Sequence, residues 1–440
     1  MIIEFTVGNF NSFNEKRTLC LEASGGVSEL KNNFFTFEKH TLLRTIVLYG
    51  ANSSGKSNLI MALAAMKNCV LSSVRLNDNE ALSYQPFLLA KDSIEQPTFF
   101  EIVFIAEKRT FRYGFEYNQS EIRNEWLFEV KKTKESPLFI RTIEGIGVSD
   151  AFPEGKGKES ATNNNRLFIS LVAQLGGKTA KQILQWFSDY KVLSGVDTSL
   201  LSRVYDNDYT DLSLKILNKQ LDGYEFLLQF YNDIKLGFSD IEIKEADNEL
   251  FLWIKSKKTL FSDSENEQRK KIPILNTIHN QYDINGNIID KVSWSNYQHE
   301  SEGTKKIIAY SGPIFDTLRK GKILVIDELD SKLHPLITMQ IIRLFNNPKT
   351  NPNNAQLIFA THDTNLLSTD IFRRDQIWFT EKDNREQTDL YLLDDFVFAD
   401  GTKVRKDANL EKNYIAGRYG AIPYITNTLE IFNDGKNTEN

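Results

Sequence analysis

The segment Gly50–Ser57 constrains the fold of this 440-residue chain more tightly than any other feature. It reads GANSSGKS and satisfies the pattern G-x-x-x-x-G-K-[ST] in full. The apolar run Thr45–Tyr49 precedes it, and apolar residues recur at helical spacing from Lys56 to Met66. In such a strand–loop–helix unit, successive backbone N–H groups and the helix N-terminus face a bound phosphate. The sequence therefore predicts an α/β core that binds a nucleotide.

Each residue type in this loop has a chemical role toward ATP and Mg²⁺. The glycines allow the backbone to curl around phosphate oxygens. Lys56 is expected to reach the β- and γ-phosphates and to assist catalysis, and the Ser57 hydroxyl to bind Mg²⁺. The residues expected to bind ATP here are Gly50, Asn52, Ser53, Ser54, Gly55, Lys56 and Ser57.

A second apolar strand, Ile323–Ile326, ends in the carboxylates of Asp327 and Glu328. A strand this apolar lies inside a sheet, and ligands bind at the carboxyl ends of strands in such folds. We expect Asp327 to hold Mg²⁺, directly or through water. Glu328 is the expected general base for the water that attacks the γ-phosphate.

Two further segments follow the chain order of an ABC/SMC-type ATPase. Ser301, Gly303 and Thr304 precede a helix and combine a hydroxyl, a glycine N–H and a helix N-terminus, which together favour an anion. In the ABC/SMC class such a segment contacts the γ-phosphate held by the other protomer. His362 lies at the end of the strand that begins with the apolar run Leu357–Ala360, where that class places the catalytic histidine that senses the γ-phosphate and steadies the attacking water.

Two assignments near these motifs keep an alternative. Gln85 is a candidate metal-sensing residue between the loop and the insertion, but an ordinary surface glutamine fits as well. Ser331 and His334 follow the acidic strand, where a dimer-contacting loop would lie in the ABC/SMC class.

The long separation of Gly50 from Asp327 distinguishes this chain from AAA+ modules and small GTPases, in which the two motifs lie far closer. A wide gap predicts an ABC/SMC-like P-loop ATPase head with a mixed β-sheet, interrupted by an insertion of antiparallel β-strands and helices. No long heptad run is present, so we expect no long coiled coil. The predicted parts are residues 1–95 and 301–395 for the head, 96–300 for the insertion, and 396–440 for a C-terminal segment.

Local patterns predict the elements of the insertion. Residues 99–117 and 122–131 alternate apolar and polar side chains, which is typical of antiparallel strands. The period is helical from about 178 to 236, and strand-like pieces return near 241–256.

Composition excludes several classes of protein. With 53 basic and 59 acidic residues the formal charge is −6, which argues against a uniformly basic nucleic-acid coat but leaves local basic patches open. No apolar run reaches the roughly 18 residues that span a bilayer, and the N-terminus lacks a signal-peptide pattern, so no membrane partner is expected. Two cysteines exclude a disulfide framework and fit the reducing cytoplasm.

These motifs together resemble the AAA15/AAA21-type ATPases, whose ABC/SMC-like heads are related to the OLD and RecF groups. The sequence is most similar to the RloA-like branch and to the AriA-like ATPases of PARIS anti-phage systems. The segment Gly417–Pro423 points to the RloA-like branch. The segments that carry the resemblance are Asn9–Phe13, Gly50–Ser57, Ser301–Lys305, Asp327–Pro335, Thr361–Asp363 and Gly417–Pro423.

The resemblance implies a bacterial defence ATPase that forms a homodimer or larger homo-oligomer through composite ATP sites and controls a second protein. That effector would be an RloB-like or TOPRIM-type nuclease. OLD proteins carry a TOPRIM domain on the same chain, but too few residues follow the strand Ile377–Phe379 for one here.

Three other functions remain open at this point. The chain could be a RecF-like repair ATPase that clamps DNA, which a basic groove and salt-dependent DNA binding would favour. It could be a scaffold that binds ATP without turnover, although Glu328 argues against that. A transporter ATPase is disfavoured by the large insertion.

Overall fold

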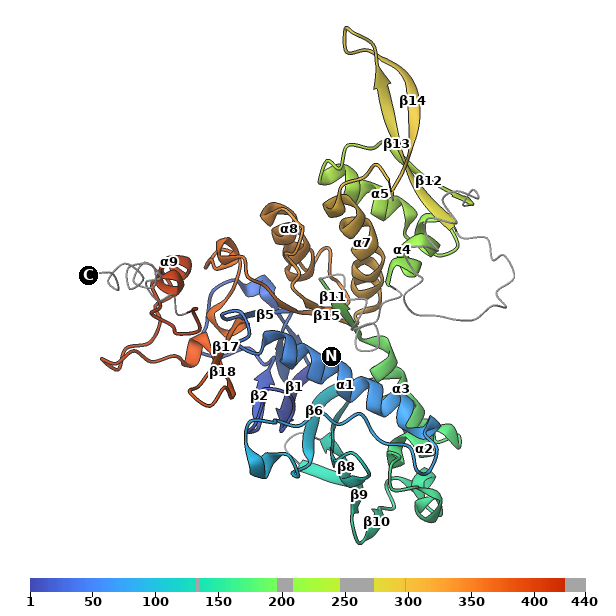
Figure 1. The fold of residues 1–440 in the computed structure, drawn as a ribbon, viewed down its shortest axis with the longest axis vertical. Coiled ribbons are helices and arrows are strands. Elements are labelled where there is room, and N and C mark those ends of the chain that lie inside the picture. The colour runs from blue at the N-terminus through green and yellow to red at the C-terminus, as the bar shows by residue number, and fades with distance from the viewer. Residues whose placement is uncertain (132–133, 196–208, 246–272, 297, 424–440) are drawn as a thin grey trace, which may run out of the picture. The chain divides into compact units, whose positions relative to one another are not determined.

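The computed structural model describes residues 1–131, 134–195, 209–245, 273–296 and 298–423, with elements labelled as in Figure 1. Contacts divide the chain into two units, which we treat separately. The phosphate-loop unit comprises residues 2–187 and 359–440. The acidic-strand unit comprises Met1 and residues 188–358.

A seven-stranded sheet forms much of the phosphate-loop unit. Its order is β10-β9-β8-β7-β6-β1-β2, and every pairing is antiparallel. The strands predicted at 99–117 and 122–131 are confirmed, because they correspond to β6, β7 and β8. The strands are β1 (Ile2–Gly8), β2 (Arg17–Cys20), β6 (Thr98–Ala106), β7 (Arg109–Tyr117), β8 (Ile122–Lys131), β9 (Lys134–Thr142) and β10 (Gly145–Val148).

Alternation along these strands directs aromatic rings to one face of the sheet. Phe111, Tyr113 and Phe115 on β7 are each buried, as the period-two pattern predicts. Phe100 lies opposite Phe115 in the β6–β7 ladder, and their ring centroids are 5.8 Å apart. Apolar burial of this kind supplies most of the free energy that holds such a sheet.

The phosphate loop belongs to a second group of strands in this unit. β5 (Thr45–Tyr49) is buried at every residue and pairs in parallel with β17 (Ile377–Lys382). β17 in turn pairs antiparallel with β18 (Thr388–Leu392). The predicted strands at 45–49 and 377–379 are confirmed.

Helix α1 (Lys56–Ser72) follows the loop and buries Leu59, Ile60, Leu63 and Met66. The predicted helix is confirmed and extends beyond Met66. With the short turn to Arg75 its mean hydropathy is 1.3, so length and composition alone would allow it to cross a bilayer. Half of the apolar 18-residue stretch within Lys56–Arg75 is buried inside the protein, which is typical of a core helix.

Smaller elements complete the phosphate-loop unit. Phe104 of the sheet packs against Trp186 with ring centroids 4.1 Å apart, so the amphipathic helix α3 covers the aromatic face. The elements are β3 (Phe34–Phe37), β4 (His40–Leu43), α2 (Phe168–Gln174), α3 (Lys178–Asp189) and α9 (Leu410–Ile415).

The acidic-strand unit is built around β15 (Ile323–Asp327), which is buried at every residue. β15 pairs in parallel with β11 (Lys191–Ser194). The helical pattern predicted for 178–236 was wrong at this point, because the short buried run Val192-Leu193 satisfies either period. The unit also contains α7 (Glu302–Lys320), α8 (Pro335–Asn346) and β16 (Gln356–Ala360), within which the chain passes to the other unit.

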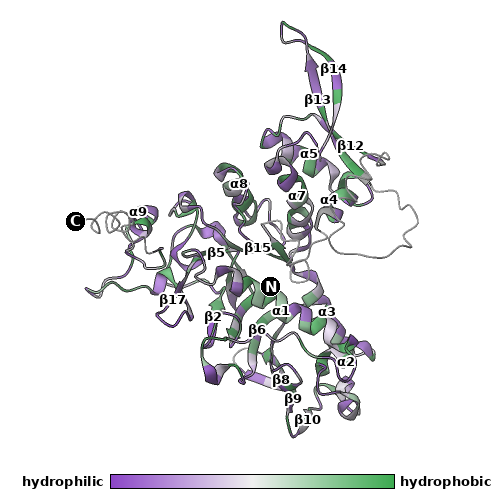
Figure 2. Cartoon of the chain, in the orientation of Figure 1, coloured by the Kyte–Doolittle hydropathy of each residue, from purple (hydrophilic) through white to green (hydrophobic). Residues whose placement is uncertain are grey.

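The same unit carries a small sheet in the order β12-β13-β14. The hairpin of β13 and β14 extends away from α4, α5 and α7 and carries hydrophobic and hydrophilic residues together (Figures 1 and 2). β12 confirms the start of the strand predicted near 241–256, and residues 246–256 lie outside the described ranges. The elements are α4 (Tyr209–Leu217), α5 (Tyr224–Asp233), β12 (Asp240–Glu245), β13 (Pro273–Tyr282) and β14 (Ile288–Ser295). In the described ranges no helix exceeds the 19 residues of α7, so no long coiled coil is present there.

Candidate functional site

The phosphate loop connects β5 to α1, as its motif requires. Gly55 is the residue before the first turn of α1 and has a φ of 113°, a conformation that favours glycine. A Cβ on Gly55 would lie 2.2 Å from Thr388 Oγ1, and one on Gly50 would lie 2.4 Å from the Thr380 carbonyl oxygen. Both glycines are therefore required by close packing against β17 and β18 as well as by backbone shape.

Lys56 lies over this loop. Its side chain is buried, and Nζ donates hydrogen bonds to the carbonyl oxygens of Gly50 (2.8 Å) and Ala51 (3.0 Å). Asn52 and Ser53 are exposed at the top of the loop, and Ser57 is half-buried in the first turn of α1. An ammonium beside a curled backbone at a helix N-terminus is the arrangement that binds phosphate.

Four hydroxyl and amide side chains that sequence reasoning did not assign to the site support the loop from behind. Thr388 Oγ1 donates to the Ser54 carbonyl oxygen (2.9 Å) and shares a hydrogen bond with Ser12 Oγ (2.7 Å). Ser54 Oγ bonds to Thr380 Oγ1 (2.6 Å), and Asn58 Nδ2 donates to Ser12 Oγ (2.7 Å). Ser12 lies in the Asn9–Phe13 motif, but nothing in the local sequence marks Thr380 or Thr388.

Gln85 lies close to the first turns of α1. It is exposed and lines a pocket of 390 Å³ together with Ser12, Asn58 and Met61. Its backbone oxygen accepts a hydrogen bond from Asn11 N (2.8 Å). The phosphate-loop unit thus brings Gln85 to the helix that carries Lys56 and Ser57, which is compatible with a metal-sensing role.

His362 lies on a segment that is anchored to the strand before the phosphate loop. Thr361 N donates to the Leu48 carbonyl oxygen (3.2 Å), and Tyr49 OH donates to the Asp363 carbonyl oxygen (3.0 Å). Between these two anchors His362 is exposed. The predicted histidine therefore lies beside the end of β5 in the same unit as Lys56.

The Gly417–Pro423 segment also packs near the end of β5. Tyr414, just before it, lies 5.8 Å from the Tyr49 ring and 5.5 Å from the Phe379 ring, measured between centroids. Tyr414 OH donates to the Ala421 carbonyl oxygen (3.0 Å), which closes the segment on itself. Burial raises the pKa of Tyr414 to about 12, so the hydroxyl remains a donor at neutral pH.

The acidic-strand unit holds the two predicted carboxylates at the end of β15. Asp327 is buried and Glu328 is half-buried, with a left-handed φ of 51° that turns the chain sharply. Gly195, at the end of β11, donates its N–H to the Asp327 carbonyl oxygen (2.6 Å). A Cβ on Gly195 would lie 1.9 Å from the Glu328 carbonyl oxygen, so only glycine fits beside this turn.

The segment Ser301–Thr304, which we call the signature segment, packs against the loop that follows Glu328. Ser301 is the N-cap of α7, and its Oγ accepts a hydrogen bond from Thr304 N (3.1 Å). A Cβ on Gly303 would lie 2.9 Å from the Lys332 carbonyl oxygen. The unit therefore brings Ser301, Gly303 and Thr304 beside the residues that follow the acidic pair.

Two residues of α7 that sequence reasoning missed extend this contact. Lys306 Nζ donates to the carbonyl oxygens of Gly195 (2.9 Å) and Ser331, and Tyr310 OH donates to the Ser194 carbonyl oxygen (3.1 Å). Burial lowers the pKa of Lys306 to about 8, against the opposing effect of the nearby Asp330 carboxylate. Lys306 is half-buried, and a charged residue at the second turn of a helix gives no sequence signal of this partial burial.

Ser331 and His334 lie on the same loop. Ser331 N donates to the Glu328 carbonyl oxygen (3.1 Å). His334 is exposed, and its Nδ1 accepts a hydrogen bond from Leu336 N (3.2 Å), so it caps α8. This hydrogen bond fixes the ring at one nitrogen, and the dimer-contact role of Ser331 and His334 stays a prediction.

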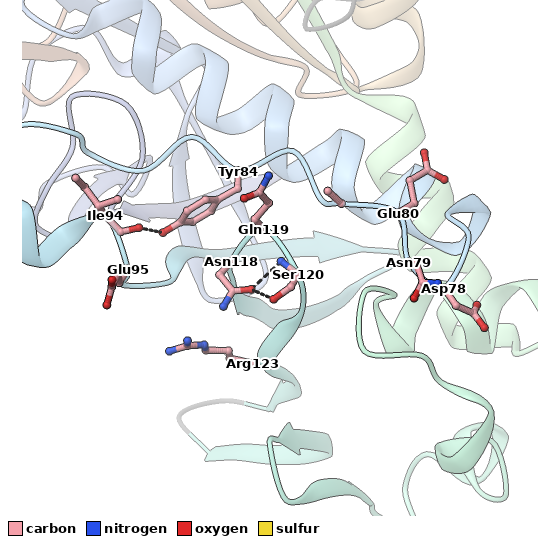
Figure 3. A pocket seen from close by; sticks show the side chains of 11 residues that line it. Asp78, Asn79, Glu80, Tyr84, Ile94, Glu95, Asn118, Gln119, Ser120 and Arg123 are labelled. Atoms are coloured by element: carbon pink, nitrogen blue, oxygen red, sulfur yellow. Dashed lines mark hydrogen bonds between the residues drawn. The ribbon is translucent and has the colours of Figure 1, made fainter.

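A larger pocket of 680 Å³ lies elsewhere in the phosphate-loop unit (Figure 3). Tyr84 and the turn Asn118–Ser120 line it, with Tyr84 OH donating to the Ile94 carbonyl oxygen (2.9 Å). Three of its lining residues are acidic, namely Asp78, Glu80 and Glu95, and Arg123 is basic. A pocket with this excess of carboxylates disfavours a nucleotide phosphate, so its size does not make it the ATP site.

Strand, loop, helix and strand-end carboxylates define a P-loop nucleotide-binding protein. The family described as "AAA domain, putative AbiEii toxin, Type IV TA system" matches residues 46–368. Because the match covers more than half of the chain, the chain belongs to this AAA-domain family, the AAA21 type that its motifs predicted.

The SMC head domain from Thermotoga maritima is similar in structure with a TM-score of 0.39 and 12% identity, covering 89% of this chain and 98% of that domain. A comparison with curated protein sequences finds no match.

Proposed function

We propose that this protein binds and hydrolyses ATP, and that two copies associate through composite ATP sites. The observation that carries the proposal is the packing of the signature segment against the loop after Glu328, with Gly303 set against the Lys332 carbonyl. A surface that presents the exposed Ser301, with Gly303 next to the Lys332 carbonyl, suits contact with nucleotide held by a second copy. Gly50–Ser57 of the phosphate-loop unit supply the complementary phosphate site.

The residues present fit Mg-ATP. Each of the expected metal-binding residues carries an oxygen of the kind that Mg²⁺ prefers: the Ser57 hydroxyl and the Gln85 amide in the phosphate-loop unit, and the buried Asp327 carboxylate in the acidic-strand unit. Mg²⁺, when bound, neutralises charge on the β- and γ-phosphate oxygens. Lys56 would bind the same oxygens, Glu328 would accept a proton from the attacking water, and His362 would orient that water.

We infer further that the ATPase controls a separate effector in bacterial anti-phage defence and acts in the cytoplasm. The resemblance to RloA-like and AriA-like ATPases supports this role. The family description, which names a putative AbiEii toxin of a type IV toxin–antitoxin system, agrees with a two-protein assembly. The effector would be a nuclease of the RloB-like or TOPRIM type.

Light scattering combined with phosphate release tests the ATPase proposal on wild type and Glu328→Gln, each with and without Mg-ATP. Glu328→Gln should bind ATP, lose hydrolysis by about 100-fold or more because its general base is gone, and accumulate a stable oligomer. Glu225→Gln on α5 is the matched control, since Glu225 is exposed and should leave both readouts unchanged.

Two results would contradict the proposal. If Glu328→Gln still hydrolyses ATP, Glu328 is not the general base. If wild-type hydrolysis is independent of protein concentration, and neither wild type nor Glu328→Gln forms an oligomer, the ATP site is not shared between two copies. The trapped oligomer, if it forms, also serves as bait for the effector.

A further inference from the structure

Lys306 joins three segments of the acidic-strand unit. It lies in the second turn of α7, and its Nζ donates to Gly195 O (2.9 Å) at the end of β11 and to Ser331 O on the loop after β15. One turn further along α7, Tyr310 OH donates to Ser194 O (3.1 Å). The helix that starts at Ser301 is therefore hydrogen-bonded to both segments that flank the acidic pair.

The two residues whose carbonyl groups accept from Lys306 are themselves hydrogen-bonded, through their backbone N–H groups, to Asp327 and Glu328. Gly195 N donates to Asp327 O (2.6 Å), and Ser331 N donates to Glu328 O (3.1 Å). One hydrogen bond thus separates each acceptor of Lys306 from the backbone of Asp327 or Glu328. If α7 moved, the hydrogen bonds of the Lys306 ammonium would shift the turn that orients the Glu328 carboxylate.

The chemistry of this position favours a role beyond packing. Removing an ammonium from water costs free energy unless hydrogen bonds replace the lost hydration, and Lys306 finds two backbone acceptors. An apolar side chain of similar length could cover the Tyr310 ring, which lies 5.2 Å from Nζ, without that cost. Packing alone therefore does not explain a lysine here, whereas a need to hold two carbonyl groups does.

We propose that Lys306 is a positioning residue of ATP hydrolysis, which fixes the loop carrying Glu328 to the helix that begins at Ser301. This inference rests on the ATPase function proposed above. Contact of the signature segment with nucleotide on a second copy would then set the position of Glu328 in the same subunit.

The test compares Lys306→Met, which keeps the length of the side chain and removes its donors, with Lys306→Arg, which keeps charge and donors. Lys306→Met should lower kcat by about 10- to 100-fold, because small displacements of a catalytic group have effects of that size. The Kd for ATP, measured separately, should stay unchanged, because the substitution changes hydrogen bonds to Gly195 and Ser331 and alters no residue of the phosphate loop. Lys306→Arg should recover most of the lost rate.

Lys320→Met is the matched control on the same helix. Lys320 pairs with Asp316 (2.5 Å) and is the last residue of α7, at the opposite end of the helix from Lys306. This variant should keep wild-type kcat. A melting temperature measured for all three variants separates loss of position from loss of fold.

Amide hydrogen exchange gives a readout that does not depend on activity. Residues 329–334 should exchange faster in Lys306→Met than in wild type, while residues 59–66 of α1 stay unchanged. Unchanged exchange in residues 329–334, or an unchanged kcat, would overturn the role of Lys306. A wild-type protein without any ATPase activity would instead refute the proposed function, so the two failures are distinguishable.

Discussion

Gly195→Ala is the most direct test of the geometry around Glu328. The added Cβ would lie 1.9 Å from the Glu328 carbonyl oxygen, and contacts shorter than 3.0 Å are essentially never seen. The two must therefore move apart by about 1.1 Å. A displacement of about 1 Å at a catalytic group costs on the order of 100-fold in rate, which equals about 2.7 kcal/mol in activation free energy.

The assay is steady-state phosphate release at saturating Mg-ATP, with ATP affinity measured by calorimetry. We expect a large fall in kcat and little change in Kd, because the substitution displaces the turn at Glu328 and changes no residue of the phosphate loop. Gly25→Ala is the control, since a Cβ on Gly25 meets no atom within 4 Å. A Gly195→Ala protein with wild-type kcat would refute the argument that the end of β11 determines the position of Glu328.

Two predictions concern the supports of the site. Thr388→Val removes the hydroxyl that is hydrogen-bonded to the Ser54 carbonyl oxygen and should raise the Kd for ATP by about 10-fold. The control Thr18→Val, at an exposed position of β2, should leave the Kd unchanged. Equal affinities of the two variants would contradict the supporting role of β18. Burial lowers the pKa of Lys306 to about 8, so the unfolded chain, with its ordinary pKa of 10.5, binds more protons between these values. The free energy of unfolding of wild type should therefore rise relative to Lys306→Met as the pH increases from 8 to 10.5, and a constant difference in denaturant titrations would contradict burial of the charge.

Local pattern identified the phosphate loop because its chemistry is local. The loop Gly50–Ser57 needs two glycines, a lysine and a hydroxyl at fixed spacing, with a strand before and a helix after. The apolar strand that ends at Asp327 was equally plain, since burial on both faces demands an unbroken apolar run. The roles assigned to Glu328, His362 and the Ser301–Thr304 segment remain predictions.

The strand Lys191–Ser194 shows the limit of periodicity. Four residues satisfy a helical or an extended pattern equally, and the structure makes them β11 because Ser194 pairs with Asp327 in a parallel ladder. Likewise, only the tertiary structure places β1 between β2 and β6 in one sheet, because strand order depends on contacts between residues far apart in the chain.

By itself, therefore, the sequence determined where the phosphate-loop motif lies and which strand ends in carboxylates, because spacing along the chain and apolar runs express those features directly. The tertiary structure alone decided what holds them in place. Thr388 against Ser54, Gly195 against Glu328, and Lys306 between Gly195 and Ser331 are all contacts between segments distant in sequence. Thr388, Gly195 and Lys306 belong to no recognisable sequence motif, and each acquires its role from the residues that the fold brings next to it.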